Sequence, residues 1–108
     1  MAQKSFIPTH PGEVIKDELI ARGIIQKEFA QRIGVPYTVL NDTLNERRPL
    51  SAKLALLIES ALGISADLLM GLQSDYNMQM ARSDAEIKRR IRKINPYPNL
   101  AMQAASPA

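Results

Sequence analysis

The sequence predicts an all-α protein. Apolar residues recur at helical spacing in successive segments, and glycine or proline interrupts the pattern between the segments. No run of four or more alternating or β-branched residues lies outside this pattern, so no strand is expected. The chain of 108 residues is long enough for one domain with an adequate hydrophobic core.

The first two helices are expected over residues 11–22 and 26–33. Acidic side chains occupy the first half of the first helix and Arg22 closes it, as the helix dipole favours. Gly23 ends this helix. Ile25 stands where Ser or Thr usually caps a helix, so the second helix starts at a cost of about 1 kcal/mol that packing must offset.

A third helix follows a tight turn. Gly34 can end the second helix in the left-handed conformation, and Pro36 suits the first turn of the third. A helical wheel places Tyr37, Thr38, Asn41, Asp42 and Asn45 on one polar arc, with Leu40, Thr43 and Leu44 opposite. This is the helix-turn-helix pattern, whose second helix can enter a DNA major groove. From the pattern alone, two core helices with a solvated outer face fit equally well.

Two further helices complete the predicted domain. Pro49 closes a loop, and Ser51 caps a fourth helix over residues 52–62. Its core stripe is expected to comprise Leu54, Leu57, Ile58, Ala61 and Leu62. Ser65 caps a fifth helix, whose stripe comprises Leu69, Leu72, Tyr76 and Met80.

A sixth, basic helix is expected beyond the domain. Ile87, Ile91 and Ile94 form one stripe, surrounded by Lys88, Arg89, Arg90, Arg92 and Lys93. Such a helix is not stable alone, so it should dock on its own core, a second subunit or an acidic partner. The expected boundaries are an arm over 1–10, ordered only if Phe6 and Ile7 dock, a domain over 11–81, this helix over 82–95 and a disordered tail over 96–108.

The net charge of +3 is unevenly distributed. Residues 1–81 carry eight Lys or Arg against nine Asp or Glu, whereas residues 82–108 carry six against two. The domain itself is therefore not a basic DNA clamp. Any phosphate contact must come from local placement of Lys27, Arg32, Arg47 and Arg48.

Several classes of function are excluded. There is no glycine-rich phosphate loop, metal-ligand cluster or paired acid and base, so we expect no enzyme, no metal and no cofactor. His10 is the only histidine and is expected to have a structural or capping role. The lack of cysteines, of a signal peptide and of a membrane span favours a cytoplasmic protein with no membrane partner.

Six motifs occur in a fixed order along the chain: His10-Pro11-Gly12-Glu13-Val14-Ile15, Arg22-Gly23-Ile24, Gln26-Lys27-Glu28-Phe29-Ala30, Ile33-Gly34-Val35, Leu44-Asn45-Glu46-Arg47-Arg48-Pro49-Leu50-Ser51 and Ala61-Leu62-Gly63-Ile64-Ser65-Ala66. Together they resemble the HigA family of antitoxins, a branch of the XRE, or Cro/C1-type, helix-turn-helix proteins. The likeness covers roughly residues 6–81.

The resemblance implies a lambda-repressor-like domain of five helices, here with a C-terminal helical extension, that acts as a homodimer. Members of the family repress their own operon at a palindromic operator in double-stranded DNA. They also neutralise a HigB-type toxin, an mRNA endonuclease. The interface with a second subunit or partner would involve the fifth and sixth helices, through Leu69, Leu72, Tyr76, Ile87, Ile91 and Ile94.

The resemblance also implies DNA-binding residues. Gln26 would contact a phosphate at the start of the second helix. Tyr37, Thr38 and Asn41 would lie at base edges or adjacent phosphates, and the Asn41 amide could pair bidentately with adenine. Arg47 and Arg48 would clamp the backbone. The full expected set is Gln26, Lys27, Tyr37, Thr38, Asn41, Asn45, Arg47 and Arg48.

Three residues depart from the family pattern. Asp42 stands where a basic residue is common, Pro36 replaces a polar cap, and Glu46 replaces a frequent glycine. A carboxylate that faces phosphates opposes DNA binding, although Asp42 could instead accept a hydrogen bond from a cytosine amino group. Two alternatives therefore stay open: a toxin-binding module with weak or complex-dependent DNA binding, and a stand-alone repressor without a toxin.

Overall fold

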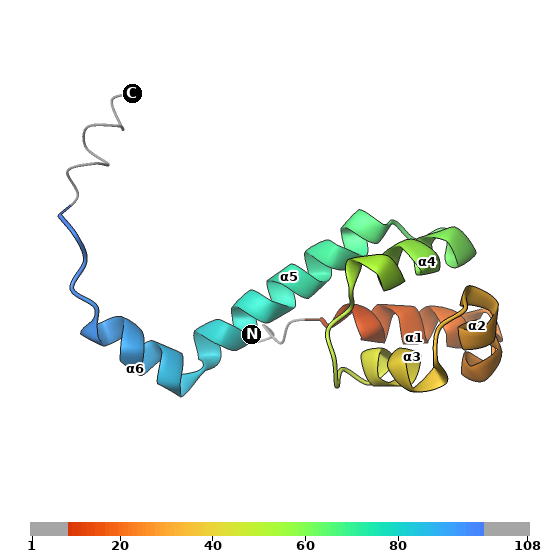
Figure 1. The fold of residues 1–108 in the computed structure, drawn as a ribbon, viewed down its shortest axis with the longest axis horizontal. Helices are drawn as coiled ribbons and strands as arrows, with labels where there is room; N and C mark the ends of the chain where they lie inside the picture. Colours follow the sequence, from red (N-terminus) through yellow and green to blue (C-terminus); the bar gives the residue numbers. More distant parts are fainter. Residues whose placement is uncertain (1–8, 99–108) are drawn as a thin grey trace, which may run out of the picture.

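The computed structural model describes residues 9–98, which form six α-helices and no strand (Figure 1). The expected all-α fold is confirmed. The helices are α1 (Pro11–Ala21), α2 (Gln26–Ile33), α3 (Tyr37–Leu44), α4 (Ala52–Leu62), α5 (Ala66–Ser83) and α6 (Ala85–Lys93). Phe6, Ile7 and most of the expected tail lie outside the described residues. None of the helices within residues 9–98 is both long enough and apolar enough to cross a membrane.

His10 caps α1, as the sequence predicts for this residue. Its Nδ1 accepts a hydrogen bond of 2.9 Å from the backbone N–H of Gly12, and the side chain is almost completely buried. His10 therefore belongs to the domain, and the expected arm over residues 1–10 is too long by at least this residue. Gly12 is required here because a Cβ atom would lie 2.1 Å from the backbone oxygen of Thr43 in α3.

The turn between α2 and α3 follows the prediction with one change. Ile25 makes no side-chain capping bond to α2, and Gly34 ends α2 in the left-handed conformation with φ of 76°. Pro36 was expected in the first turn of α3. It instead has an extended backbone and precedes the helix, where its carbonyl oxygen accepts from the N–H groups of Val39 and Leu40.

The hydrophobic core lies among α1 to α4 and the first half of α5 (Figure 1). Three residues of the expected α4 stripe are buried, namely Leu54, Ile58 and Leu62. The helix is rotated slightly from the expected orientation: Leu57 is 39% exposed, Ala61 is exposed, and Ala55 is buried in their place. The packing against α5 and α2 sets this rotation. The core comprises Ile15, Leu19, Phe29, Ala30, Leu40, Leu44, Leu50, Leu54, Ala55, Ile58, Leu62, Ala66 and Leu69.

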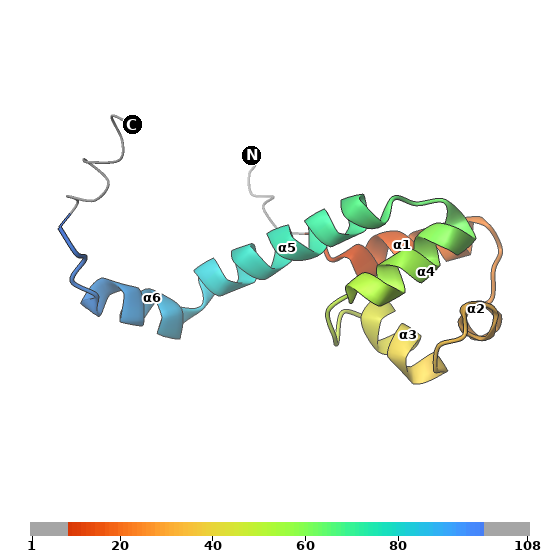
Figure 2. The ribbon, with the colours of Figure 1, turned by 45° about the horizontal axis from the view of Figure 1, so that its top comes forward.

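The second half of α5 leaves this core and carries α6 away from it, as both ribbon views show (Figures 1 and 2). Asp84 separates the two helices, and its carboxylate accepts from the N–H groups of Glu86 and Ile87 to cap α6. α6 contains no buried residue. The domain alone therefore does not cover the isoleucine stripe of α6.

Candidate nucleic-acid interface

The polar arc of α3 faces outward. Tyr37 is 43% exposed and Thr38 is exposed, whereas Asn41, Asp42 and Asn45 are half-buried. On the opposite side, Leu40, Thr43 and Leu44 are buried, and the Thr43 hydroxyl donates to the Val39 carbonyl oxygen at 2.9 Å. The buried side holds α3 to the core, so its polar side is available to a ligand.

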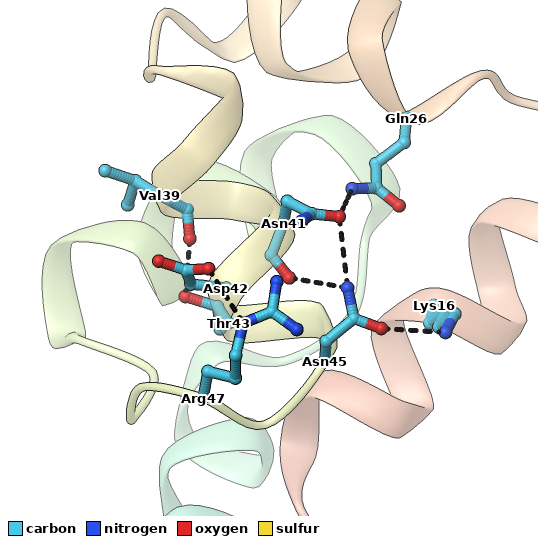
Figure 3. Close-up of polar contacts among 8 residues, drawn as sticks. All are labelled: Lys16, Gln26, Val39, Asn41, Asp42, Thr43, Asn45 and Arg47. Carbon is cyan, nitrogen blue, oxygen red and sulfur yellow. Dashed lines mark hydrogen bonds and ion pairs between the residues drawn. The ribbon is translucent and has the colours of Figure 1, made fainter.

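A chain of hydrogen bonds connects the polar arc to α1 and α2 (Figure 3). Lys16 of α1 donates from Nζ to Asn45 Oδ1 at 3.0 Å. Asn45 Nδ2 donates to the backbone oxygen of Asn41 at 2.9 Å and to Asn41 Oδ1 at 3.0 Å. Gln26, the first residue of α2, donates from Nε2 to the same Asn41 Oδ1 at 2.8 Å. The side chain of Asn41 is thus held from two sides.

These hydrogen bonds give Gln26 a contact that the sequence did not predict. The resemblance implies that Gln26 contacts a phosphate, and in the free chain its amide nitrogen donates to Asn41. Lys16 was missed altogether. Its partner lies 29 residues away, and only the packing of α1 beside α3 brings the two together, so no local pattern could have identified it. The other expected residue of α2, Lys27, is exposed in its first turn.

Asp42 and Arg47 form an ion pair at the end of α3 (Figure 3). Arg47 Nε lies 3.1 Å from Asp42 Oδ1, and the Arg47 backbone N–H donates to the Asp42 carbonyl oxygen at 2.8 Å. Asp42 was expected to present an uncompensated carboxylate to phosphates. In the free chain this charge is instead matched by Arg47, the residue expected to clamp the DNA backbone.

Glu46 adopts the left-handed conformation, with φ of 64°, directly after α3. Among residues 9–98 no other non-glycine residue has a positive φ. Glycine adopts this conformation without a steric penalty, whereas a residue with a Cβ atom does not. The loop backbone at Glu46 is therefore strained.

The loop that carries Arg47 and Arg48 is fixed from α1 and α5. His10 lies beside Glu46 and Arg48 of this loop, and its ring meets the Tyr76 ring edge-on at 4.8 Å. The buried Gln73 side chain accepts from the Leu50 N–H at 2.7 Å. Burial lowers the pKa of His10, although the Glu46 charge and the Arg48 backbone oppose this shift. Arg48 itself is exposed.

The residues expected at a subunit or partner interface differ in how much of their surface is exposed. Leu69 has no exposed surface and belongs to the core of its own chain, so it is removed from the proposed interface. Leu72 and Tyr76 in α5 are half-buried, as is Ile87 in α6. Ile91 and Ile94 are 59% and 65% exposed.

Two short helices joined by a glycine turn, with a polar outer face on the second, define a helix-turn-helix protein. The sequence profile of the Helix-turn-helix family matches residues 15–69, which include α2, α3 and the core helices around them. The chain belongs to this family, in its XRE-type branch, and its structural neighbours include HigA antitoxins.

Three comparisons describe the relatives. The Virulence-associated protein A' of Dichelobacter nodosus is 31% identical over 90 residues, which cover 82% of this chain and 78% of the relative. PA4674 of Pseudomonas aeruginosa, solved in complex with its operator DNA, has a TM-score of 0.72 and 33% identity, covering 83% of this chain and 99% of that chain. The Pseudomonas aeruginosa antitoxin HigA, solved with the higBA promoter, has a TM-score of 0.73 and 33% identity, covering 82% and 97%.

Proposed function

We propose that this chain is a sequence-specific DNA-binding antitoxin that represses its own operon. The observation that carries the proposal is the outward polar face of α3, which is anchored by Leu40 and Leu44 and braced by Gln26. Family membership supports the assignment, as do the similar proteins that were solved on operator or promoter DNA. Tyr37, Thr38 and Asn41 would meet base edges or adjacent phosphates, while Lys27 and Arg48 would contact the backbone.

We further propose that the chain binds DNA as a homodimer. Two copies would place their α3 helices in successive major grooves about 34 Å apart, so the operator would be an inverted repeat. Exposed apolar side chains on the second half of α5 and on α6 support a subunit contact there, because the chain itself leaves them uncovered. They comprise Met78, Met80, Ile91 and Ile94, beside the half-buried Leu72, Tyr76 and Ile87.

The partner of the antitoxin would be a HigB-type toxin, an mRNA endonuclease encoded next to it, and both would act in the cytoplasm. Similarity to an antitoxin named HigA supports this choice. The chain itself would bind and regulate without catalysis. Copurification tests the assignment: when the neighbouring gene is coexpressed, its small basic product should elute with this chain. A chain that elutes alone would indicate a stand-alone repressor.

A salt titration tests the DNA-binding function. Affinity for a duplex from the region upstream of its own gene should fall steeply as salt rises, in proportion to the number of phosphates contacted. A random duplex of the same length is the control and should bind more weakly at every salt concentration. The Asp42–Arg47 ion pair favours one alternative, a toxin-binding module that contacts DNA weakly, because it occupies a cation near α3. Equal, weak binding to both duplexes would select this alternative.

A further inference from the structure

The orientation of the Asn41 amide follows from two groups whose hydrogen-bonding roles cannot be exchanged. The Lys16 ammonium group can only donate, so the atom of Asn45 that faces it must be the oxygen. The backbone carbonyl of Asn41 can only accept, so the atom of Asn45 that faces it must be the nitrogen. Both conditions are met by one orientation of the Asn45 amide, which is therefore determined.

The Asn45 orientation then determines that of Asn41. Asn45 Nδ2 lies 3.0 Å from the Asn41 side chain and requires an acceptor there, so Oδ1 of Asn41 faces it. Gln26 Nε2 donates to the same oxygen at 2.8 Å (Figure 3). A carbonyl oxygen has two lone pairs, and both are now used. Within residues 9–98, the Nδ2 group of Asn41 has no hydrogen-bond partner in the chain.

This arrangement conflicts with the bidentate pairing to adenine that the sequence suggested. That pairing needs the amide oxygen to accept from adenine N6 while the nitrogen donates to N7. The oxygen of Asn41 is engaged inside the protein, so the side chain offers a donor alone. Guanine presents two acceptors in the major groove, N7 and O6. Thymine presents one acceptor, O4, beside its methyl group, adenine presents one acceptor beside a donor, and cytosine presents a donor.

We propose that Asn41 is a specificity-determining residue that recognises guanine by donating from Nδ2, and that Lys16, Asn45 and Gln26 are positioning residues that enforce this mode. The proposal rests on the proposed DNA-binding function and names the base that α3 selects. It gives Lys16 a role in specificity although it lies on α1, outside the two helices of the motif.

A panel of duplexes tests the proposal. Each base pair of a half-site from the upstream region is replaced in turn by the other three, and binding of the wild-type chain and of Asn41→Ala is measured. The position read by Asn41 is the one at which Asn41→Ala loses discrimination, and there the wild type should prefer guanine over each of the other three bases about tenfold. Asn95→Ala is a matched control, because Asn95 is exposed beyond α6, and it should keep the wild-type preferences.

A double variant reverses the positioning. Gln26→Glu with Asn45→Ala turns one neighbour of the Asn41 side chain into an acceptor and removes the donor on the other side, so Nδ2 should turn inward and Oδ1 outward. The preference should shift from guanine toward adenine and cytosine, which present donors. The added carboxylate weakens binding to all DNA, so the ratio between duplexes is the readout. A guanine preference that survives in the folded double variant would overturn the positioning roles.

The remaining outcomes separate this proposal from the proposed function. A wild-type preference for adenine or thymine, or Asn41→Ala that keeps discrimination at every position, overturns the proposal while operator binding stands. Failure to distinguish operator from random DNA overturns both. In free protein, solvent exchange of side-chain amide protons provides a test without DNA: the Asn41 protons should exchange faster than those of Asn45. The reverse order would overturn the assigned orientation.

Discussion

Two acidic residues lie at the end of α3 and in the loop that follows it. Glu46, in the loop, has a left-handed backbone conformation, and Asp42, in α3, forms an ion pair with Arg47. These two carboxylates also make the candidate interface less positive than that of a basic DNA clamp. Each carboxylate can be removed separately. Replacing Glu46 should affect the stability of the chain, and replacing Asp42 should affect DNA binding.

Replacing Glu46 with glycine should stabilise the chain. The left-handed conformation costs a non-glycine residue about 1–2 kcal/mol, and the greater unfolded-state entropy of glycine offsets part of the gain. We expect a net increase of about 0.5–1 kcal/mol in the free energy of unfolding, measured by urea denaturation. Glu28→Gly is the matched control: Glu28 is exposed in α2, so glycine there should destabilise by about 1 kcal/mol. Equal losses in both variants would contradict strain at Glu46.

Replacing Asp42 with asparagine should strengthen non-specific DNA binding. The change frees Arg47 from its 3.1 Å ion pair, so one more cation can neutralise a phosphate. Affinity for random DNA should rise, and the slope of log affinity against log salt should steepen by about one. Stability should change little because the pair is exposed to solvent. In the Arg47→Ala background the same replacement should change the salt slope much less. An equal change in both backgrounds would exclude release of Arg47 as the cause.

At the scale of elements, His10 connects the start of α1 to α5 and to the loop after α3. Its Nδ1 accepts from Gly12, so the neutral ring carries its proton on Nε2. Protonation of Nδ1 would remove the cap of α1. The contacts to Tyr76 and to the Arg48 backbone depend on the same ring, so stability and loop position are coupled through one titrating group.

The pKa of His10 predicts how stability depends on pH. Burial lowers the pKa in the folded chain below its ordinary value of 6.5, so the unfolded chain takes up the proton first. The stabilisation is fully present above pH 6.5 and is lost as pH falls from there toward the folded pKa. Free energies of unfolding measured at about pH 7.5 and pH 5.5 should show this loss. His10→Asn keeps a capping acceptor without the titration and should show a flatter profile; an unchanged profile would rule out His10.

At the scale of the whole molecule, periodicity predicts more of the fold than of the site. The α4 bounds and the outward arc of α3 follow from residue spacing, which is a local property. The burial of Ala55 in place of Leu57 does not, because packing against other helices sets the rotation of α4. The Lys16 to Asn45 bond likewise joins residues 29 apart in sequence. The spacing along α3 therefore predicts Asn41 as a recognition residue, but the hydrogen bonds of its amide oxygen depend on contacts between helices that the spacing does not show.

The residues that stabilise the fold lie in a different part of the molecule from those that would form a subunit interface. The molecule measures 56 × 33 × 29 Å because α5 projects from the core and carries α6 at its end (Figure 2). The isoleucine stripe of α6 contains no fully buried residue, so it adds little to the stability of its own chain. Ile91, 59% exposed in α6, should therefore matter for the proposed dimer and not for the fold of the monomer.

Deleting the chain after Ser83 tests this separation. The free energy of unfolding of the truncated monomer should change by less than about 0.5 kcal/mol, because α6 buries no residue. Dimerisation, measured by sedimentation equilibrium, should weaken, and Ile91→Asp in the full chain should weaken it in the same direction. Lys93→Asp, which changes the charge of α6 outside the isoleucine stripe, is the matched control. A truncated chain that unfolds would place the stripe in the core, whereas a dimer of unchanged affinity would confine the interface to α5.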